Sequence, residues 1–267
     1  MTGILRVIAD KGITAGKKIV YWRRGEPIQY GTHTLHYVPG TRPPKFKYLE
    51  TGDPTTRNEL RQIDFLLQRV KAGDVALDVG AHVGQYAVLL GALTGPTGHV
   101  SSFEPDPIAR SVLERNIALN NFGDRVSVET VALSDENGSH TFFSLGGNSM
   151  SSLARTGLGT AAHSDEVREY NVQTMRMDDF LAARGLSPAW IKIDTEGAEV
   201  LILRGATKTL KTARGILCEI HPYAWSEFGS TFDELLTLVR ASGRKIRYLD
   251  PAVSVGDGPV YGTMVIE

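Results

Sequence analysis

Short apolar runs alternate with stretches of helical periodicity from residue 75 onward. The runs at 75–79 and 100–103 are each followed by a segment in which apolar residues recur at helical spacing, ending near Leu93 and Asn120. Alternation of this kind predicts a doubly wound α/β fold, in which a mostly parallel sheet is connected by crossover helices. Further strands are expected at 126–131, 190–193 and 216–220, and further helices at 177–184, 198–210 and 231–241.

The end of the chain breaks this alternation. Apolar runs at 245–249 and 260–266 are separated by the turn-rich segment 250–259, which is too short for a crossover helix. These two strands are therefore expected to form an antiparallel hairpin at the end of the sheet.

The first part of the chain has a different pattern. Weak alternation over 17–38, with the turn-like run 24–27, predicts one or two β-hairpins before a loop at 39–44. Apolar positions from Leu60 to Val70 then recur at helical spacing, with Thr56 or Asn58 as the expected N-cap. We expect an N-terminal β-hairpin appendage over 1–54 and a single catalytic domain over 55–267.

One long internal segment has no sustained periodicity. Residues 144–170 are rich in Gly, Ser, Thr and Ala. A segment of this length inside a compact domain is usually either disordered or a functional lid. We expect it to shape a substrate pocket, with Asn148, Ser149 and Ser151 as candidate polar contacts.

Composition excludes several classes of function. The 29 basic and 30 acidic residues give a formal net charge of -1, and no extended basic run is present, so a nucleic acid partner is not expected. The first ten residues are interrupted by Arg6 and Asp10, and no apolar run approaches the roughly 20 residues that span a bilayer. The single cysteine, Cys218, follows an apolar run and is interpreted as a core residue. We expect a cytoplasmic protein with no membrane insertion.

The most informative motif surrounds the first strand of the alternating region. Asp78 lies in the run 75–79, and Gly80 and Gly84 flank a turn that leads into a helix. Glycines at such a turn permit positive φ and close approach of a ligand, and N–H groups at the helix start attract a ligand carboxylate. Asp78 is expected near a ligand ammonium group. A purely structural turn is the alternative for this loop taken alone.

A dinucleotide site is the other alternative for this loop. Its G-x-G-x-x-G fingerprint requires glycines at the positions held here by His82 and Gln85. The fingerprint is therefore absent, which argues against a nicotinamide dehydrogenase.

Two later strand ends supply further candidate binding groups. Glu104 follows the second strand, where nucleotide-binding folds place the acid that accepts both ribose hydroxyls. The third unit, 130–135, offers backbone and apolar side chains around Ala132 to sandwich an adenine, although such a run is also typical of plain core.

Carboxylates gather after the strand at 190–193. Ligands in open α/β sheets bind beyond the carboxyl ends of the strands, so Asp194 is expected to face the site, and the next strand brings Glu219, His221 and Tyr223 to the same rim. Transfer of a group to a hydroxyl oxygen needs a base, and His221, or Asp194 acting with it, fills that role.

Two other interpretations of these carboxylates stay open. Asp194, Glu219 and His221 offer ligands for Mg²⁺ or another divalent ion, although no metal is predicted. Glu196 and Glu199 also fit acids favoured by the dipole at a helix N-terminus, and for Glu199 this is the preferred interpretation.

Together the motifs resemble the FkbM methyltransferase family. The resemblance is carried by 77–84, 103–105, 132–135 and 191–199, in that order, and extends over about 75–249. It implies a seven-stranded Rossmann-like fold that uses S-adenosylmethionine to methylate hydroxyls of sugars, polyketides and related natural products. His82 departs from the family, which commonly has Asn at this position of the loop.

The sequence therefore predicts an S-adenosylmethionine-dependent O-methyltransferase acting on a small-molecule hydroxyl. An N-methyltransferase for a small molecule or peptide, and a catalytically inactive cofactor-binding partner subunit, remain as alternatives, and a homo-oligomer stays open. The expected catalytic residues are Asp194, His221 and Glu196, the expected cofactor-binding residues are Asp78, Gly80, Ala81, His82, Gly84, Glu104, Pro105 and Ala132, and the expected acceptor contacts are Asn148, Ser149 and Tyr223.

Overall fold

A seven-stranded sheet forms the centre of the computed structural model, which describes residues 23–45, 48, 52–155 and 166–267. Its strand order is β11-β12-β10-β9-β3-β4-β5. The strands β3, β4, β5, β9 and β10 run parallel to one another, whereas β12 is antiparallel to both β10 and β11. The bounds are β3 Val75–Val79, β4 His99–Phe103, β5 Val126–Glu129, β9 Trp190–Ile193, β10 Gly215–Ile220, β11 Ile246–Tyr248 and β12 Gly262–Ile266.

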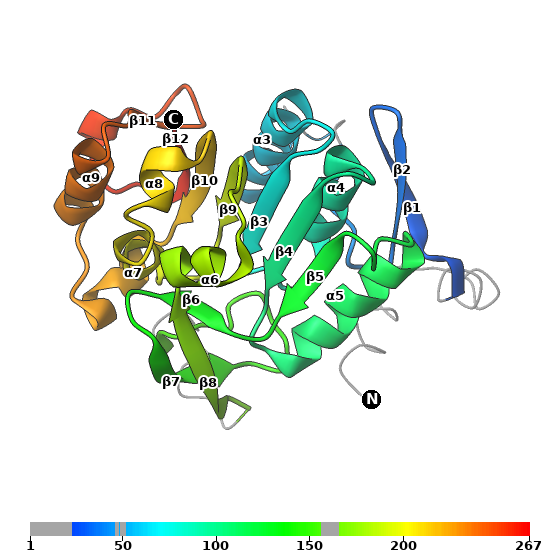
Figure 1. Ribbon diagram of the computed structural model, residues 1–267, viewed down its shortest axis with the longest axis horizontal. Helices are drawn as coiled ribbons and strands as arrows, with labels where there is room; N and C mark the ends of the chain where they lie inside the picture. Colours follow the sequence, from blue (N-terminus) through cyan, green and yellow to red (C-terminus); the bar gives the residue numbers. More distant parts are fainter. Residues whose placement is uncertain (1–22, 46–47, 49–51, 156–165) are drawn as a thin grey trace.

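This topology confirms the doubly wound, mostly parallel sheet with a C-terminal antiparallel hairpin. Every residue of β9 and β10 is buried, which is typical of strands covered on both faces. The hairpin places β12 between β10 and β11, so the last strand of the chain lies inside the sheet (Figure 1).

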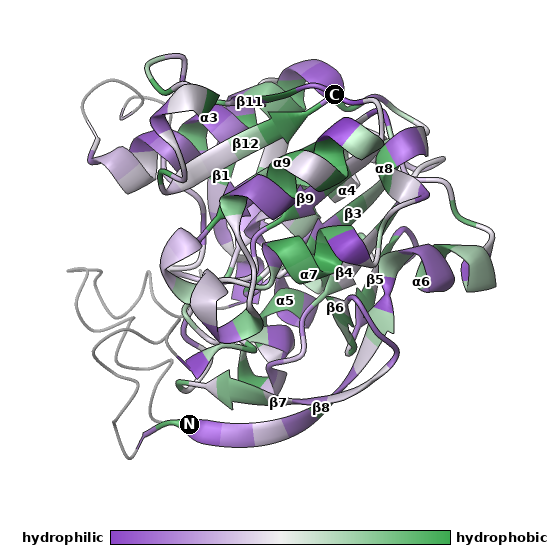
Figure 2. Cartoon of the chain, turned by 90° about the vertical axis from the view of Figure 1, so that its left-hand side faces the viewer, coloured by the Kyte–Doolittle hydropathy of each residue, from purple (hydrophilic) through white to green (hydrophobic). Residues whose placement is uncertain are grey.

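Two apolar clusters cover the two faces of the sheet. One joins the sheet to α3 (Pro54–Arg69), α4 (Gln85–Thr94) and α5 (Pro107–Leu119). The other joins it to α6 (Met177–Arg184), α7 (Glu199–Arg204) and α9 (Phe232–Ala241). Residues 200–203, in the middle of α7, are apolar and buried, and this helix is mostly green in Figure 2, as its position against the sheet requires.

The helix starts follow local capping chemistry. Asp53, rather than the expected Thr56 or Asn58, caps α3 by accepting a hydrogen bond from the Thr56 N–H, and Pro54 occupies the first helical position. Asp106 caps α5 in the same way, accepting from the Ile108 N–H ahead of Pro107. The expectation for α3 was wrong because the cap lies just before the proline.

The N-terminal hairpin consists of β1 (Glu26–Tyr30) and β2 (His33–Tyr37). Its turn lies between these strands, not at 24–27 as the sequence suggested, because Glu26 and Pro27 belong to β1 and pair with β2. Tyr30 and Tyr37 are buried in the same apolar cluster as α4, and the hairpin lies beside α4 and α5 (Figure 1). The division into an appendage over 1–54 and a domain over 55–267 stays a prediction, since residues 1–22 lie outside the described part of the chain.

A second, three-stranded sheet was not expected from the sequence. It consists of β6 (Ala132–Ser134), β8 (Arg168–Arg176) and β7 (Gly138–Ser144) in the order β6-β8-β7. The expected strand at 126–131 therefore ends at Glu129, and the chain enters this second sheet. The irregular segment expected over 144–170 is shorter, because both of its ends lie in β7 and β8, and its residues 156–165 lie outside the described part.

The single helix expected over 198–210 is also wrong. It is divided into α7 and α8 (Thr209–Thr212). Gly205 separates the two helices at a point where a Cβ atom would overlap the backbone carbonyl oxygen of Ser134. Close packing against β6 thus ends the helix.

Cys218 is fully buried in β10, which confirms its interpretation as a core residue. Burial raises the pKa of its thiol well above the usual value, so the thiolate is disfavoured. None of the helices in the described ranges combines the length and apolar character needed to cross a membrane.

Asn116 links α5 to the segment after the hairpin and to the loop before α4, and its loss has a defined expected cost. Its Oδ1 accepts from the Val38 N–H at 2.6 Å, and its Nδ2 donates to the Val83 carbonyl at 2.7 Å. Asn116→Ala would leave both backbone groups without these partners, which should lower the free energy of unfolding by about 3 kcal/mol in urea denaturation. Ser111→Ala, at an exposed position on the same helix, is the matched control. Equal stability of the two variants would contradict this role.

Candidate active site

An open cavity lies at the carboxyl ends of β3, β4 and β9, and its volume is about 570 Å³ including its mouth. This is where ligands bind in open α/β sheets. Most of the residues expected at the site line this one cavity: Gly80, His82, Glu104, Pro105, Ala132, Asn148, Ser149, Ser151, Asp194 and Glu196.

The glycines of the loop after β3 are required by packing within the chain. Gly80 has a φ of 80°, and a Cβ atom there would overlap the backbone carbonyl oxygen of Asp194. Gly84 begins α4 with a φ of 85°, and a Cβ atom there would overlap the side chain of Leu113. Gly80 lines the cavity, whereas Gly84 and Ala81 do not. The loop is therefore held by close approach of β3 to β9 and of α4 to α5.

Asp78 does not line the cavity, contrary to the position expected from sequence. Its carboxyl is fully buried and faces the N–H of Ala87 without a hydrogen bond of normal geometry. Burial raises the pKa of Asp78 to about 6, against the opposing effect of the Lys192 ammonium. Asp78 therefore interacts electrostatically with Lys192 and Asp194 without lining the cavity.

Glu104 lies on the cavity wall with its carboxylate fixed by two backbone donors. Its oxygens accept from the N–H of His82 at 2.7 Å and from the N–H of Asp106 at 2.8 Å. Burial raises the pKa of Glu104 to about 8, although both of these hydrogen bonds lower it. In the ionised form, each oxygen keeps a second lone pair for a ligand hydroxyl.

His82 connects the glycine loop to the segment that covers the cavity. Its backbone has a φ of 48°, and its Nε2 lies 2.8 Å from the carbonyl oxygen of Gly147. Burial lowers the pKa of His82, so the neutral ring donates its Nε2 proton to that carbonyl. The cavity-lining residues Asn148 and Ser149 directly follow Gly147, so His82 holds the covering segment in place.

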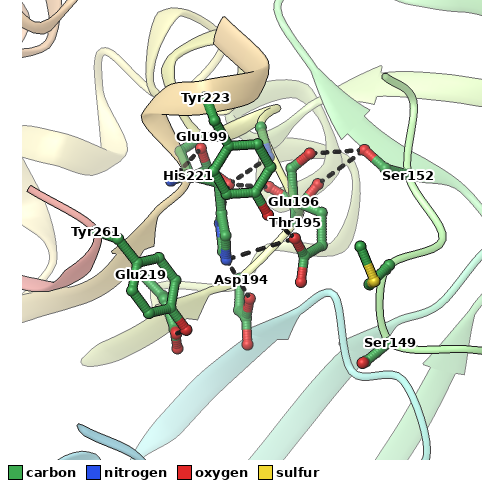
Figure 3. A network of polar contacts seen from close by, with 12 residues as sticks. Ser149, Ser152, Asp194, Thr195, Glu196, Glu199, Glu219, His221, Tyr223 and Tyr261 are labelled. Carbon is green, nitrogen blue, oxygen red and sulfur yellow. Dashed lines mark hydrogen bonds and ion pairs between the residues drawn. The ribbon is translucent and has the colours of Figure 1, made fainter. Parts of the chain in front are cut away.

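His221 and Glu199 form a buried pair behind the cavity (Figure 3). The His221 Nδ1 lies 3.0 Å from a Glu199 oxygen, and Glu199 is held by the Gly197 N–H and by the Trp225 indole N–H, each at 2.8 Å. A histidine anchored through Nδ1 presents Nε2 to the site. This Nε2 lies 3.8 Å from Asp194 and 3.6 Å from Glu196.

The surrounding carboxylates set the charge of His221. Burial alone lowers its pKa, but the hydrogen bond and charge of Glu199 and the charges of Asp194 and Glu196 raise it to about 10. Burial raises the pKa of Glu196 to about 7, while the pKa of Asp194 is lowered despite burial, chiefly by Lys192 and then by His221. The free protein therefore holds His221 as an imidazolium beside an ionised Asp194.

Lys192 is a buried cation that the sequence analysis did not identify as part of the site. Its Nζ lies 2.9 Å from Asp194 and 4.3 Å from the centre of the Tyr86 ring, and the residue is 2% exposed. Lys192 and Asp194 are two positions apart, which places both on one face of the strand. That spacing was the available signal.

Glu219 occupies a different place from the one expected for a metal ligand. Its carboxylate accepts from Gln62 at 2.7 Å, from Asn58 at 3.2 Å and from the Tyr261 hydroxyl at 2.6 Å. Within the described ranges, the candidate ligand atoms that lie within 4.8 Å of one another belong instead to Asp194, Glu196 and His221. Lys192 already neutralises Asp194, which disfavours a dication at this trio.

Tyr223, expected as an acceptor contact, lies outside the cavity wall. It is 53% exposed, and its hydroxyl donates to Glu196 at 2.6 Å. The buried role of Glu199 was missed, since its position at the start of α7 is equally well explained by the helix dipole.

Comparison with known proteins identifies one family. Residues 78–246 match the family described as "Methyltransferase FkbM domain". The chain is 26% identical over 199 residues to 31-O-demethyl-FK506 methyltransferase FkbM of Streptomyces tacrolimicus, covering 65% of this chain and 74% of that protein. It is 25% identical over 170 residues to the hexuronic acid methyltransferase AglP of Haloferax volcanii, covering 62% of this chain and 63% of that protein.

Among solved structures, the methyltransferase FkbM from Methylobacillus flagellatus KT resembles this chain with a TM-score of 0.46 and 16% identity. The match covers 79% of this chain and 52% of that one, so the chain spans about half of the crystallised protein.

Replacing the partner of His221 should change its titration. Glu199→Gln removes a negative charge, so the pKa of His221 should fall from about 10 toward its ordinary value of 6.5. Imidazole NMR resonances followed against pH measure this directly, with Glu114→Gln at an exposed helix position as control. An unchanged midpoint in Glu199→Gln would show that the pair does not control His221.

The same pair predicts a pH dependence of stability. The folded pKa of His221 lies above its unfolded value, so protonation stabilises the fold fully below about pH 6.5, and this contribution is lost as the pH rises through about 10. In urea denaturation, the stability difference between the wild type and His221→Gln should shrink over that range. A difference that grows with pH would contradict the assigned charge state.

Proposed function

The chain belongs to the FkbM methyltransferase family, and from this premise we propose that it transfers the methyl group of S-adenosylmethionine to a hydroxyl oxygen of a sugar, a polyketide or a related natural product. The observation that carries the proposal is that one cavity brings the Glu104 carboxylate together with Asp194 and Glu196, in front of the oriented His221. The names of two relatives, which act on a demethylated FK506 and on a hexuronic acid, support this acceptor class.

The cavity wall offers separate contacts for the parts of the cofactor. The free lone pairs of Glu104 accept hydrogen bonds from the ribose hydroxyls, while Ala132, Leu133 and Phe142 provide an apolar surface for the adenine. Pro105 and the backbone at Gly80 complete the wall around the nucleoside.

The sulfonium end of the cofactor belongs beside the carboxylates. Asp194 and Glu196 stabilise a positive charge, and this stabilisation weakens as methyl transfer converts the sulfonium to a neutral thioether. Much of the rate comes from holding the acceptor oxygen, the methyl carbon and the sulfur in line. The Ser152 hydroxyl donates to the Glu196 carbonyl at 2.8 Å (Figure 3). This hydrogen bond connects the backbone of Glu196 to the segment 148–153 that lines the cavity.

His221 takes the proton of the substrate's hydroxyl group on its Nε2 atom. In the free protein its pKa is about 10, so it is protonated. A bound sulfonium beside Asp194 and Glu196 adds positive charge and lowers the pKa of His221 toward neutrality. As the new oxygen–carbon bond forms and the sulfur–carbon bond breaks, the hydroxyl proton moves to Nε2, and Glu199 stabilises the resulting imidazolium.

Calorimetry and product analysis test the proposal. We expect the purified protein to bind S-adenosylmethionine and S-adenosylhomocysteine and to ignore NAD. Incubation with glycoside and polyketide alcohols should then yield S-adenosylhomocysteine and a methyl ether identified by mass spectrometry. Cofactor binding with no turnover on any acceptor would indicate an inactive partner subunit, and methylation only of amines would indicate an N-methyltransferase.

Two substitutions should separate cofactor binding from chemistry. Glu104→Gln replaces one carboxyl oxygen with an amide nitrogen that cannot accept a hydrogen bond, and should raise the Kd for S-adenosylmethionine at least about tenfold, a loss of about 1.4 kcal/mol. His221→Gln should lower kcat by about 10²-fold to 10⁴-fold and leave that Kd nearly unchanged. Glu114→Gln, at an exposed position on α5, is the control for both. Wild-type turnover in His221→Gln would exclude it as the base.

A further inference from the structure

Two exposed tyrosines flank the His221 ring at the outer side of the candidate active site. Tyr223, from the 3-10 helix η3 (Pro222–Phe228), is 53% exposed, and Tyr261, directly before β12, is 44% exposed. Their ring centres lie 5.8 Å and 5.4 Å from that of His221, which lies between them in Figure 3. Large aromatic rings left exposed beside a reactive group are available to a ligand.

Both rings are held in place through their hydroxyl groups. Tyr223 donates to Glu196 and Tyr261 donates to Glu219, each at 2.6 Å. Burial of the hydroxyls and the adjacent carboxylates raise the pKa of both tyrosines, so these protons stay in place. Rings fixed before a ligand arrives lose little conformational entropy on binding.

The Glu219 end of this rim is fixed from a second direction. Gln62 and Asn58, on α3, donate to the same carboxylate that accepts from Tyr261. Glu219 is therefore surrounded by donors from α3 and from the segment before β12. These hydrogen bonds connect two distant parts of the sequence at one side of the site.

The two tyrosine donors of this rim are already used within the protein. Tyr223 and Tyr261 each direct their single proton to a carboxylate, and the remaining polar capacity of Glu196 and Glu219 consists of acceptor lone pairs. A ligand that binds these two carboxylates must therefore supply hydrogen-bond donors, as hydroxyl groups do.

The charges of the rim disfavour an anionic ligand. In the part of the chain that the structure describes, the cations that contact Asp194, Glu196 and Glu199 are Lys192 and His221. Each of these two cations is 2% exposed and already paired with carboxylates. A carboxylate on the ligand would meet acidic groups whose cation partners, Lys192 and His221, are already engaged.

We infer that the acceptor is an uncharged, hydroxyl-bearing ring that packs its apolar face on Tyr223 and Tyr261 and directs one hydroxyl to the His221 Nε2. This inference rests on the proposed methyl transfer and specifies its acceptor: a neutral sugar ring, which carries a C–H face and several hydroxyl donors, fits this rim. A uronate ring of the same shape does not fit it.

Matched pairs of ligands test the charge preference. With saturating S-adenosylhomocysteine, binding of neutral methyl hexopyranosides and of the corresponding methyl uronates is followed by saturation-transfer NMR. The neutral members should bind at least about tenfold more tightly. Equal or tighter binding of the uronates, or no binding of any neutral pyranoside, would overturn the inference.

Ring-removing and ring-keeping variants test the place of binding. Tyr223→Ala and Tyr261→Ala should each weaken binding of the neutral pyranoside about tenfold, and Tyr223→Phe and Tyr261→Phe should weaken it less. If both alanine variants bind like the wild type, the rim is not the acceptor site.

Binding of S-adenosylmethionine distinguishes failure of the proposed function from failure of the inference about the acceptor. If S-adenosylmethionine does not bind the wild type, the proposed function fails. If S-adenosylmethionine binds and its methyl group is transferred preferentially to uronates, the proposed function stands and the inference about the acceptor is wrong.

Discussion

The contact between the tips of β3 and β9 is the constraint on which the rest of the site depends. The Gly80 α-carbon lies so close to the Asp194 carbonyl that no side chain fits between them, and the Asp194 N–H donates to Val79 at 2.9 Å. This contact fixes Asp194 at the wall of the cavity. Because β10 pairs with β9 in parallel register, with Cys218 opposite Ile193, His221 lies beside Asp194 at the same edge of the sheet.

Two buried cations stabilise the cluster of acidic side chains at this edge of the sheet. Charges removed from water are strongly destabilising unless they are paired and hydrogen-bonded. Lys192 forms an ion pair with Asp194, and His221 forms one with the fully buried Glu199. Asp194, which lines the cavity, is thus held ionised and in a fixed position before any ligand binds, so little reorganisation of this group is needed during the reaction.

The sequence predicted the parts of the site that depend on local motifs and strand ends. Glu104, Asp194 and Glu196 line the expected cavity, since parallel strands bring their carboxyl ends to one edge. Asp78 differs, because its side chain points toward α4, an orientation that the motif does not determine. The three-stranded sheet was missed because β8 has only scattered buried positions, and no apolar run marks it.

A crystal structure with S-adenosylhomocysteine bound tests whether the cofactor lies in the cavity at the strand ends. We expect the ribose hydroxyls on Glu104, the adenine beside Ala132, and the thioether sulfur next to Asp194 and Glu196 with its open side toward His221. A product bound elsewhere, or a sulfur directed away from His221, would contradict the account.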